Sequence, residues 1–310
     1  MKTLFALPKR EIDPHTWCFL SGRICALENN LLRRDSFERL LLLEGTKEIL
    51  TSLKEPPLRD DFLTPEDVLN FEEILQRRFF RLLQEVKELS PTLVVWELLQ
   101  TRYDLINLKN FLKERLFGLS RPTPFPSPYT DETWEALWEG VEARLTLPLQ
   151  DDGQARPLQV WQTETYQMAL KDLRGRLEKI SENPGLVDLI LDGAYLSCLP
   201  QLAERTASPF IINYCLEYQK LMGILFSRRA STKVSRGGVT PSLPGYEKMV
   251  EDTLMERLEA ARLFVFGPER VFGYLKGLET ETLNLRLAIG GRLQGIPPED
   301  INRRLRKGYV

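Results

Sequence analysis

Residues 104–115 of this chain read Asp-Leu-Ile-Asn-Leu-Lys-Asn-Phe-Leu-Lys-Glu-Arg, and the pattern of this stretch recurs twice further along. In each copy an acid is followed three residues later by Asn or Lys, then by Leu, and eleven residues after the acid by Arg. The copies are Asp104-Asn107-Leu108-Arg115, Glu217-Lys220-Leu221-Arg228 and Glu281-Asn284-Leu285-Arg292. These offsets fall within one band of an α-helix, so each copy predicts a helix with an apolar stripe beside a polar edge. The uneven spacing favours three helical units with insertions of different length over a regular solenoid, and chance similarity between amphipathic helices is the alternative.

Helical signals continue along the rest of the chain, and strand-like alternation is nowhere sustained. Asp35 and Glu38 resemble a capping box before a run of leucines, and Thr64-Pro65-Glu66-Asp67 predicts the start of a long helix that ends near Leu89. The helix with the first copy is predicted over about 93–117, with Gly118 at its carboxyl end. We therefore predict an all-α fold.

Two stretches predict boundaries between helical units. Residues 121–128 carry proline at every second position, which predicts an extended, stiff connector. Residues 231–245 are rich in Ser, Thr, Gly and Pro and predict a second boundary or a loop. The predicted units are residues 1–120, 121–235 and 236–310. Further helices are predicted over about 131–180, 210–229, 246–264 and 271–293, and the stretch 295–301 opens a short last one.

The composition is that of an ordinary globular protein and excludes several classes. Of the 310 residues, 28% are charged and 43% are hydrophobic. The chain has 42 basic and 44 acidic residues, so it lacks the excess of positive charge that is typical of nucleic-acid-binding proteins. The most apolar stretch, 186–198, is interrupted by Asp188 and Asp192, so we expect no transmembrane segment. The four cysteines form no Cys-x-x-Cys pair and predict reduced thiols in a cytosolic protein, without disulfides or zinc.

No catalytic constellation is visible. The single histidine, His15, stands near the amino terminus beside a proline, and the glycines at 290, 291 and 295 lack the spacing of a phosphate-binding loop. We therefore predict no catalytic residue, no metal site and no cofactor. The recurring acids fit a packing network of salt bridges and hydrogen bonds best, with an interaction surface and acid–base catalysis as the alternatives.

The opening of the chain resembles a known family. Residues 21–40 read Ser-Gly-Arg-Ile-Cys-Ala-Leu-Glu-Asn-Asn-Leu-Leu-Arg-Arg-Asp-Ser-Phe-Glu-Arg-Leu. This run is similar to the amino-terminal signature of the C subunits of archaeal and bacterial V-type (A-type) ATPases. The matching positions are Arg23, Ala26, Leu27, Glu28, Leu31, Leu32, Asp35, Phe37 and Leu40. The stretch 104–108, the similar one at 281–286 and the closing Gly-Ile-Pro-Pro-Glu-Asp-Ile at 295–301 also resemble that family.

The resemblance implies three similar helical domains around a pseudo-three-fold axis, forming a funnel. It further implies a non-catalytic rotor protein, a monomer within its complex, located on the cytoplasmic face of the membrane. Such a protein sits on the membrane rotor ring of proteolipid subunits and receives the D and F subunits of the central stalk, which couples ATP turnover to ion transport. Cys25 stands where a basic residue is usual, and Lys220 replaces the expected Asn. Whether the ion is a proton or sodium, and whether the complex pumps ions or makes ATP, stays open.

These expectations place partner contacts on the polar edge of the recurring helices. We expect part of that edge to line the central opening and the remainder to be buried in packing networks. The candidate residues are Asp104, Asn107, Arg115, Glu217, Lys220, Arg228, Glu281, Asn284 and Arg292. The alternative is a helical scaffold or adaptor unrelated to rotary ATPases, which would not co-purify with stalk or ring proteins.

Overall fold

The computed structural model describes residues 14–140, 164–181, 183–231 and 243–310. Every regular element within these ranges is helical, which confirms the all-α prediction. The predictions for residues 141–163 and 232–242 lie outside the described ranges.

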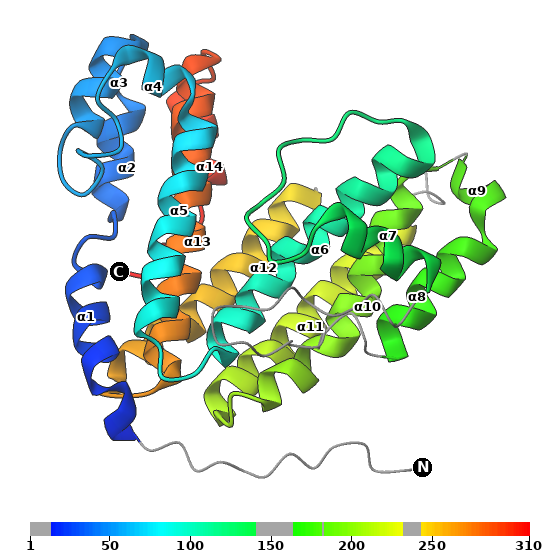
Figure 1. The fold of residues 1–310 in the computed structure, drawn as a ribbon. Helices are drawn as coiled ribbons and strands as arrows, with labels where there is room; N and C mark the ends of the chain where they lie inside the picture. The colour runs from blue at the N-terminus through cyan, green and yellow to red at the C-terminus, as the bar shows by residue number, and fades with distance from the viewer. Residues whose placement is uncertain (1–13, 141–163, 182, 232–242) are drawn as a thin grey trace.

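One group of helices contains both ends of the described chain. Figure 1 shows α5 and α13 rising side by side, with the helices of the first 70 residues against them. After a short 3₁₀ turn, Pro14–Trp17, the members are α1 (Cys18–Glu28), α2 (Arg34–Leu41), α3 (Gly45–Leu53), α4 (Pro65–Leu69), α5 (Phe71–Leu89), α13 (Pro268–Leu293) and α14 (Pro298–Arg304).

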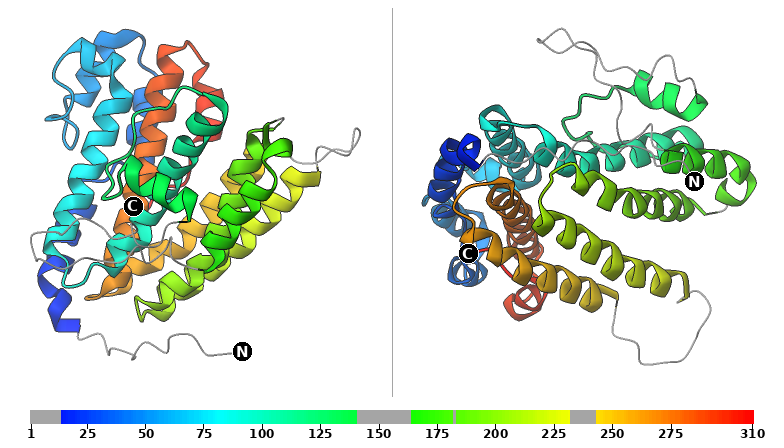
Figure 2. Two further views of the ribbon diagram at one scale, coloured as in Figure 1. Left: turned by 45° about the vertical axis from the view of Figure 1, so that its right-hand side comes forward. Right: turned by 90° about the horizontal axis from the view of Figure 1, so that it is seen from below.

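A second group slants away from the first. In Figures 1 and 2 its long helices share one end with α5 and α13 and diverge from them toward the other end. The members are α6 (Val94–Phe117), α7 (Asp131–Glu139), α8 (Glu164–Gly175), α9 (Leu177–Ser181), α10 (Gly185–Glu204), α11 (Pro209–Ser231), α12 (Leu243–Leu258) and the 3₁₀ turn Glu259–Leu263. The three recurring stretches lie on α6, α11 and α13. The pseudo-three-fold axis and the unit boundaries stay predictions.

Local signals set most of the helix ends. Thr64 and Asp67 form a complete capping box at α4, and Gly118 ends α6 with a φ of 63°.

Two expectations about helix starts and ends were wrong in detail. Asn70 interrupts the helix predicted to run on to Leu89 and divides it into α4 and α5. Asp35 does not cap α2, because it lies inside the first turn and the capping position belongs to Arg33, whose side chain makes no capping hydrogen bond.

Helix α10 is long and apolar enough to span a membrane by length and composition alone, but its surroundings are those of a core helix. It packs against α6, α8 and α11. Its two aspartates form ion pairs with α6: Lys113 Nζ lies 2.7 Å from a carboxylate oxygen of Asp188, and Lys109 pairs with Asp192. These pairs explain how two carboxylates are accommodated in the most apolar stretch of the sequence.

The stretch at 21–40 fastens the start of the chain to α5 and α13. Arg23 pairs with Glu85 of α5 at 2.6 Å. Glu28 is buried and accepts hydrogen bonds from Arg270 at 2.6 Å and from the Tyr309 hydroxyl at 3.3 Å. These side-chain contacts tie α1 to the first turn of α13 and to the end of the chain.

The carboxyl-terminal tail lies in a groove of α13 that only glycine permits. A Cβ atom on Gly277 would lie 2.6 Å from the Cβ of Tyr309, and one on Gly273 would lie 2.7 Å from the Tyr309 hydroxyl. The buried Tyr309 ring therefore rests directly on the α13 backbone.

Replacing Gly277 with alanine is expected to lower the free energy of unfolding by about 1–3 kcal/mol, because the added methyl group overlaps Tyr309. The exposed Gly193 of α10, where a Cβ would meet nothing within 4 Å, is the matched control. There the same change should stabilise the helix by about 0.5–1 kcal/mol. Chemical denaturation of both variants checks this, and a stabilised Gly277→Ala protein would show that the tail is not seated in the groove.

Candidate partner-binding site

The first copy of the recurring pattern fastens the proline-rich segment to α6. Asn107 is buried, and its amide forms a two-way pair with the main chain of Phe125: Nδ2 donates to the carbonyl at 2.8 Å, and Oδ1 accepts from the N–H at 2.9 Å. An amide is suited to this pairing because it donates and accepts at once. Residues 121–128 form no helix or strand, and Phe125 lies back against α6.

The acid of the first copy belongs to the same network. Asp104 Oδ1 accepts hydrogen bonds from the Ser127 hydroxyl at 2.7 Å and from Gln100 at 2.9 Å. Burial raises the pKa of Asp104 from 3.8 to about 7, against the lowering effect of these two hydrogen bonds. No cation contacts this carboxyl in the described residues, so no ion pair offsets the effect of burial on its pKa.

The third copy repeats the arrangement with the carboxyl-terminal tail. Asn284 is buried, and its amide pairs with the main chain of Arg306, donating to the carbonyl at 2.9 Å and accepting from the N–H at 2.8 Å. The first and third copies therefore have the same role, since each fixes an extended segment from later in the chain against its own helix.

The acid of the third copy joins α13 to α5 and to the turn after α1. Glu281 accepts a hydrogen bond from the main-chain N–H of Leu32 at 2.7 Å and pairs with Arg78 at 2.6 Å. Asp61 lies 3.5 Å from the same guanidinium. All three charged side chains are almost fully buried.

The arginines of these two copies differ in exposure. Arg292 is nearly buried and donates to the main-chain carbonyls of Leu43 and Ile296, so it closes the end of α13. Arg115 is partly exposed and pairs with Glu135 of α7 at 2.7 Å.

The second copy is different, because its polar edge faces solvent. Glu217 pairs with Arg257 of α12 at 2.5 Å, and Lys220 is exposed. With Asn213 and Leu216 these residues line an open groove of about 440 Å³. Arg228 also lies on α11, but its side chain is outside the part of the chain that the structure describes.

The structure thus separates eight of the nine candidate residues into two sets, and the Arg228 side chain lies outside the described part. Asp104, Asn107, Glu281, Asn284 and Arg292 lie in packing networks, whereas Arg115, Glu217 and Lys220 are accessible. Contact of any of them with a partner stays a prediction.

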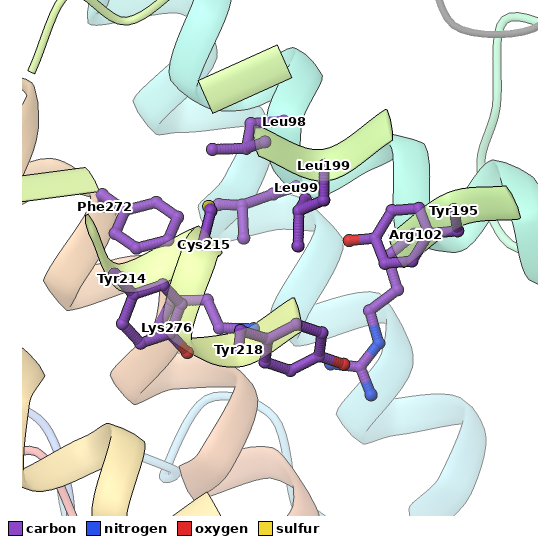
Figure 3. A pocket seen from close by; sticks show the side chains of 10 residues that line it. All are labelled: Leu98, Leu99, Arg102, Tyr195, Leu199, Tyr214, Cys215, Tyr218, Phe272 and Lys276. Atoms are coloured by element: carbon purple, nitrogen blue, oxygen red, sulfur yellow. The ribbon is translucent and has the colours of Figure 1, made fainter. Parts of the chain in front are cut away.

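A pocket that the sequence did not reveal lies where the recurring helices converge. Its cavity of about 20 Å³ is lined by side chains from the first halves of α6, α11 and α13 and the second half of α10. Figure 3 shows them around one space, with the Arg102 guanidinium beside the Tyr218 hydroxyl. The lining residues are Leu98, Leu99, Arg102, Tyr195, Leu199, Tyr214, Cys215, Tyr218, Phe272 and Lys276.

The charges at this pocket leave one positive charge in excess. Lys276 forms an ion pair with Glu279, and Glu279 also accepts a hydrogen bond from the Tyr103 hydroxyl at 2.6 Å. Burial acts to raise the pKa of Glu279, but Lys276, Arg102 and the hydrogen bonds outweigh it and hold that pKa below its ordinary value. Arg102 lies 3.9 Å from Glu279, at the outer limit of an ion pair, and its side chain is 44% exposed. The guanidinium is therefore available at the mouth of the pocket.

The hydroxyls of the pocket are hydrogen-bond donors at neutral pH. Burial raises the pKa values of Tyr195, Tyr214 and Tyr218 above the ordinary value of a tyrosine. Burial also raises the pKa of the Cys215 thiol, to about 12. Within the described residues none of these three tyrosine hydroxyls forms a hydrogen bond, although the Tyr195 and Tyr214 side chains are more than nine-tenths buried. The pocket thus offers hydroxyls without a hydrogen-bond partner in the described chain, beside the Arg102 guanidinium, which can only donate.

Sequence reasoning missed this pocket because it followed the acid of each copy. The positions two residues before the acids are Arg102, Cys215 and Glu279, and all three lie at or beside the pocket. Arg102 and Glu279 occupy equivalent positions in two copies and carry opposite charges. This was the signal that could have indicated their contact. No group of three or more metal-ligating side chains lies together in the described ranges.

Comparison with known proteins gives the family. The family model of the ATP synthase (C/AC39) subunit matches residues 20–218 and 199–304. The C subunit of the V-type sodium ATPase of Enterococcus hirae is 22% identical over 347 aligned positions, which cover 94% of this chain and 98% of that protein. The match contains the whole amino-terminal signature and extends through all three recurring helices. The chain therefore belongs to the ATP synthase (C/AC39) subunit family, which includes the C subunits of V-type ATPases.

Proposed function

We propose that this chain is a non-catalytic coupling protein that joins the central stalk, made of the D and F subunits, to the membrane rotor ring on the cytoplasmic face of the membrane. The observation that carries the proposal is the presence, on one helical frame, of two sites of different chemistry: a polar pocket with the exposed Arg102 at its mouth and an exposed apolar turn. A protein that links two partners needs two such surfaces, and each partner must recognise only its own.

The first surface lies at the convergence of α6, α11 and α13. Tyrosine and arginine, the residue types of the donor-rich pocket, are enriched among the side chains that dominate binding energy in protein interfaces. Polar and charged groups fix the register of a bound partner better than apolar ones do, and a stalk that transmits torque requires a fixed register. We assign this surface to the stalk.

The second surface is the turn between the 3₁₀ helix at 259–263 and α13. The four consecutive residues Leu263, Phe264, Val265 and Phe266 are all exposed, Leu263 by 83% and Val265 by 67%. The Phe264 ring contacts Phe210 at the start of α11, so the turn is attached to the end that the two helix groups share. A contiguous exposed apolar run marks an interaction site, and we assign it to the rotor ring.

Replacing both Leu263 and Phe266 with serine is expected to weaken binding to the detergent-solubilised ring at least tenfold, because each buried apolar side chain contributes about 1.5–3 kcal/mol. Binding to the purified stalk complex should stay unchanged. The control is Leu42→Ser, which alters the leucine directly after α2, a side chain that is 75% exposed. Pull-down and surface-binding measurements with both partners decide the matter. A protein that binds neither partner in its parent form would instead support a scaffold unrelated to rotary ATPases.

A further inference from the structure

The geometry points to a specific occupant for the donor-rich pocket: a carboxylate group of the stalk, carried by an Asp or Glu side chain or by a chain terminus, seated between Arg102 and the hydroxyls of Tyr195 and Tyr218. This inference rests on the proposed function, since it names the chemical group by which the stalk is held.

The first argument is the balance of donors and acceptors. Arg102 and the three tyrosines line the pocket, and the carboxylate within ion-pair distance of Arg102, Glu279, already binds Lys276 and Tyr103. A guanidinium only donates, and a tyrosine hydroxyl donates or accepts, so an entering acceptor is the group that can bind all of them at once. A carboxylate supplies two oxygens and no donor, and its hydrogen bonds with charged partners are about twice as strong as neutral ones.

The second argument is charge. Arg102 and Lys276 carry two positive charges against the single negative charge of Glu279. Because Lys276 is the closer partner of Glu279, the excess charge rests on the half-exposed Arg102. An entering anion neutralises it, whereas an entering cation would be repelled.

The third argument is size. A cavity of about 20 Å³ holds roughly one or two water-sized groups, so it fits the head of a carboxylate and excludes a nucleotide or a sugar. The apolar wall formed by Leu98, Leu99 and Phe272 suits the methylene groups of the side chain that carries the carboxylate. A protein side chain meets both conditions.

The test is a titration of the purified complex of the D and F subunits against the full chain and its variants. Tyr195→Phe and Tyr218→Phe remove one hydroxyl each and keep the ring, and Arg102→Gln removes the charge. Each change should weaken binding about tenfold to a hundredfold, since each removes a hydrogen bond to a charged group. Tyr129→Phe, at a half-buried tyrosine packed on Trp134 of α7, is the matched control and should leave the affinity unchanged.

The outcomes separate the two proposals. Failure of the parent chain to bind the stalk complex would refute the proposed function itself. Tight binding by the parent with equal affinity in all three pocket variants would refute the carboxylate seat and leave the proposed function standing. The last experiment repeats the titration of the parent chain with the stalk in sodium acetate and in sodium chloride of equal ionic strength. Competition by acetate supports the seat, whereas acetate binding to the pocket without effect on stalk affinity would assign it to free anions and overturn the inference.

Discussion

Replacing Glu281 with alanine is expected to lower the free energy of unfolding by about 3–5 kcal/mol, the largest single loss in this chain. The change leaves Arg78, whose side chain is 5% exposed, with Asp61 at 3.5 Å as its remaining ion-pair partner, and removes the acceptor of the Leu32 N–H. A buried guanidinium that loses its closer partner cannot recover the lost hydration.

Urea denaturation followed by circular dichroism measures the effect. The control is Glu38→Ala, which removes the half-exposed ion pair with Arg34 and should cost less than about 1 kcal/mol. Adding Arg78→Met to Glu281→Ala should recover part of the loss, because the unpaired charge is then gone. Equal, small losses for Glu281→Ala and Glu38→Ala would show that α13 is not held to α5 by this network.

The second large effect concerns pH. The pKa of the Asp104 carboxyl is about 7 in the folded chain and about 3.9 in an unfolded one, so the folded state binds this proton more tightly. The proton on Asp104 therefore contributes to the free energy of unfolding. This contribution is fully present below about pH 4 and is lost as the pH rises toward 7, by roughly 4 kcal/mol in total. Asp104→Asn keeps an acceptor for Ser127 and Gln100 but has no proton to lose.

The stability of Asp104→Asn relative to the parent should therefore rise by about 1.4 kcal/mol per pH unit between pH 5 and pH 7 and level off above. Taking the difference between the two proteins cancels the titration of all other groups. A flat profile for Asp104→Asn would mean that the Asp104 carboxyl stays ionised in the fold.

The fold followed from the sequence where the signals are local. The capping box at Thr64 and Asp67 and the terminal glycine at 118 fix helix ends through atoms a few residues apart, and both predictions were confirmed. Asp35 was misassigned because a capping box and an acid in the first helical turn share one sequence pattern, which only the backbone at Arg33 distinguishes.

The candidate site was less predictable because its contacts join distant parts of the chain. The shared spacing indicated that Asn107 and Asn284 have equivalent roles, but the pattern does not contain their partners, Phe125 and Arg306. The pocket depends on how α6, α11 and α13 cross, which no single helix encodes. For the second copy the sequence alone does show a difference. Lys220 cannot accept a hydrogen bond, so it cannot repeat the two-way pairing that Asn107 and Asn284 make.

Helix α11 allows the most direct test of where the stalk binds. Its Tyr218 belongs to the pocket and faces α6 and α13, whereas Leu216 and Ile224 are exposed on the opposite face, beside Glu217 and Lys220. Hydroxyl-radical footprinting with and without the complex of the D and F subunits reports the accessibility of each side chain separately. We expect the stalk to protect Tyr218 and to leave Leu216 and Ile224 as reactive as before. Protection of Leu216 and Ile224 with no change at Tyr218 would contradict binding at the convergence of the helices and place the stalk on the polar edge of the second copy.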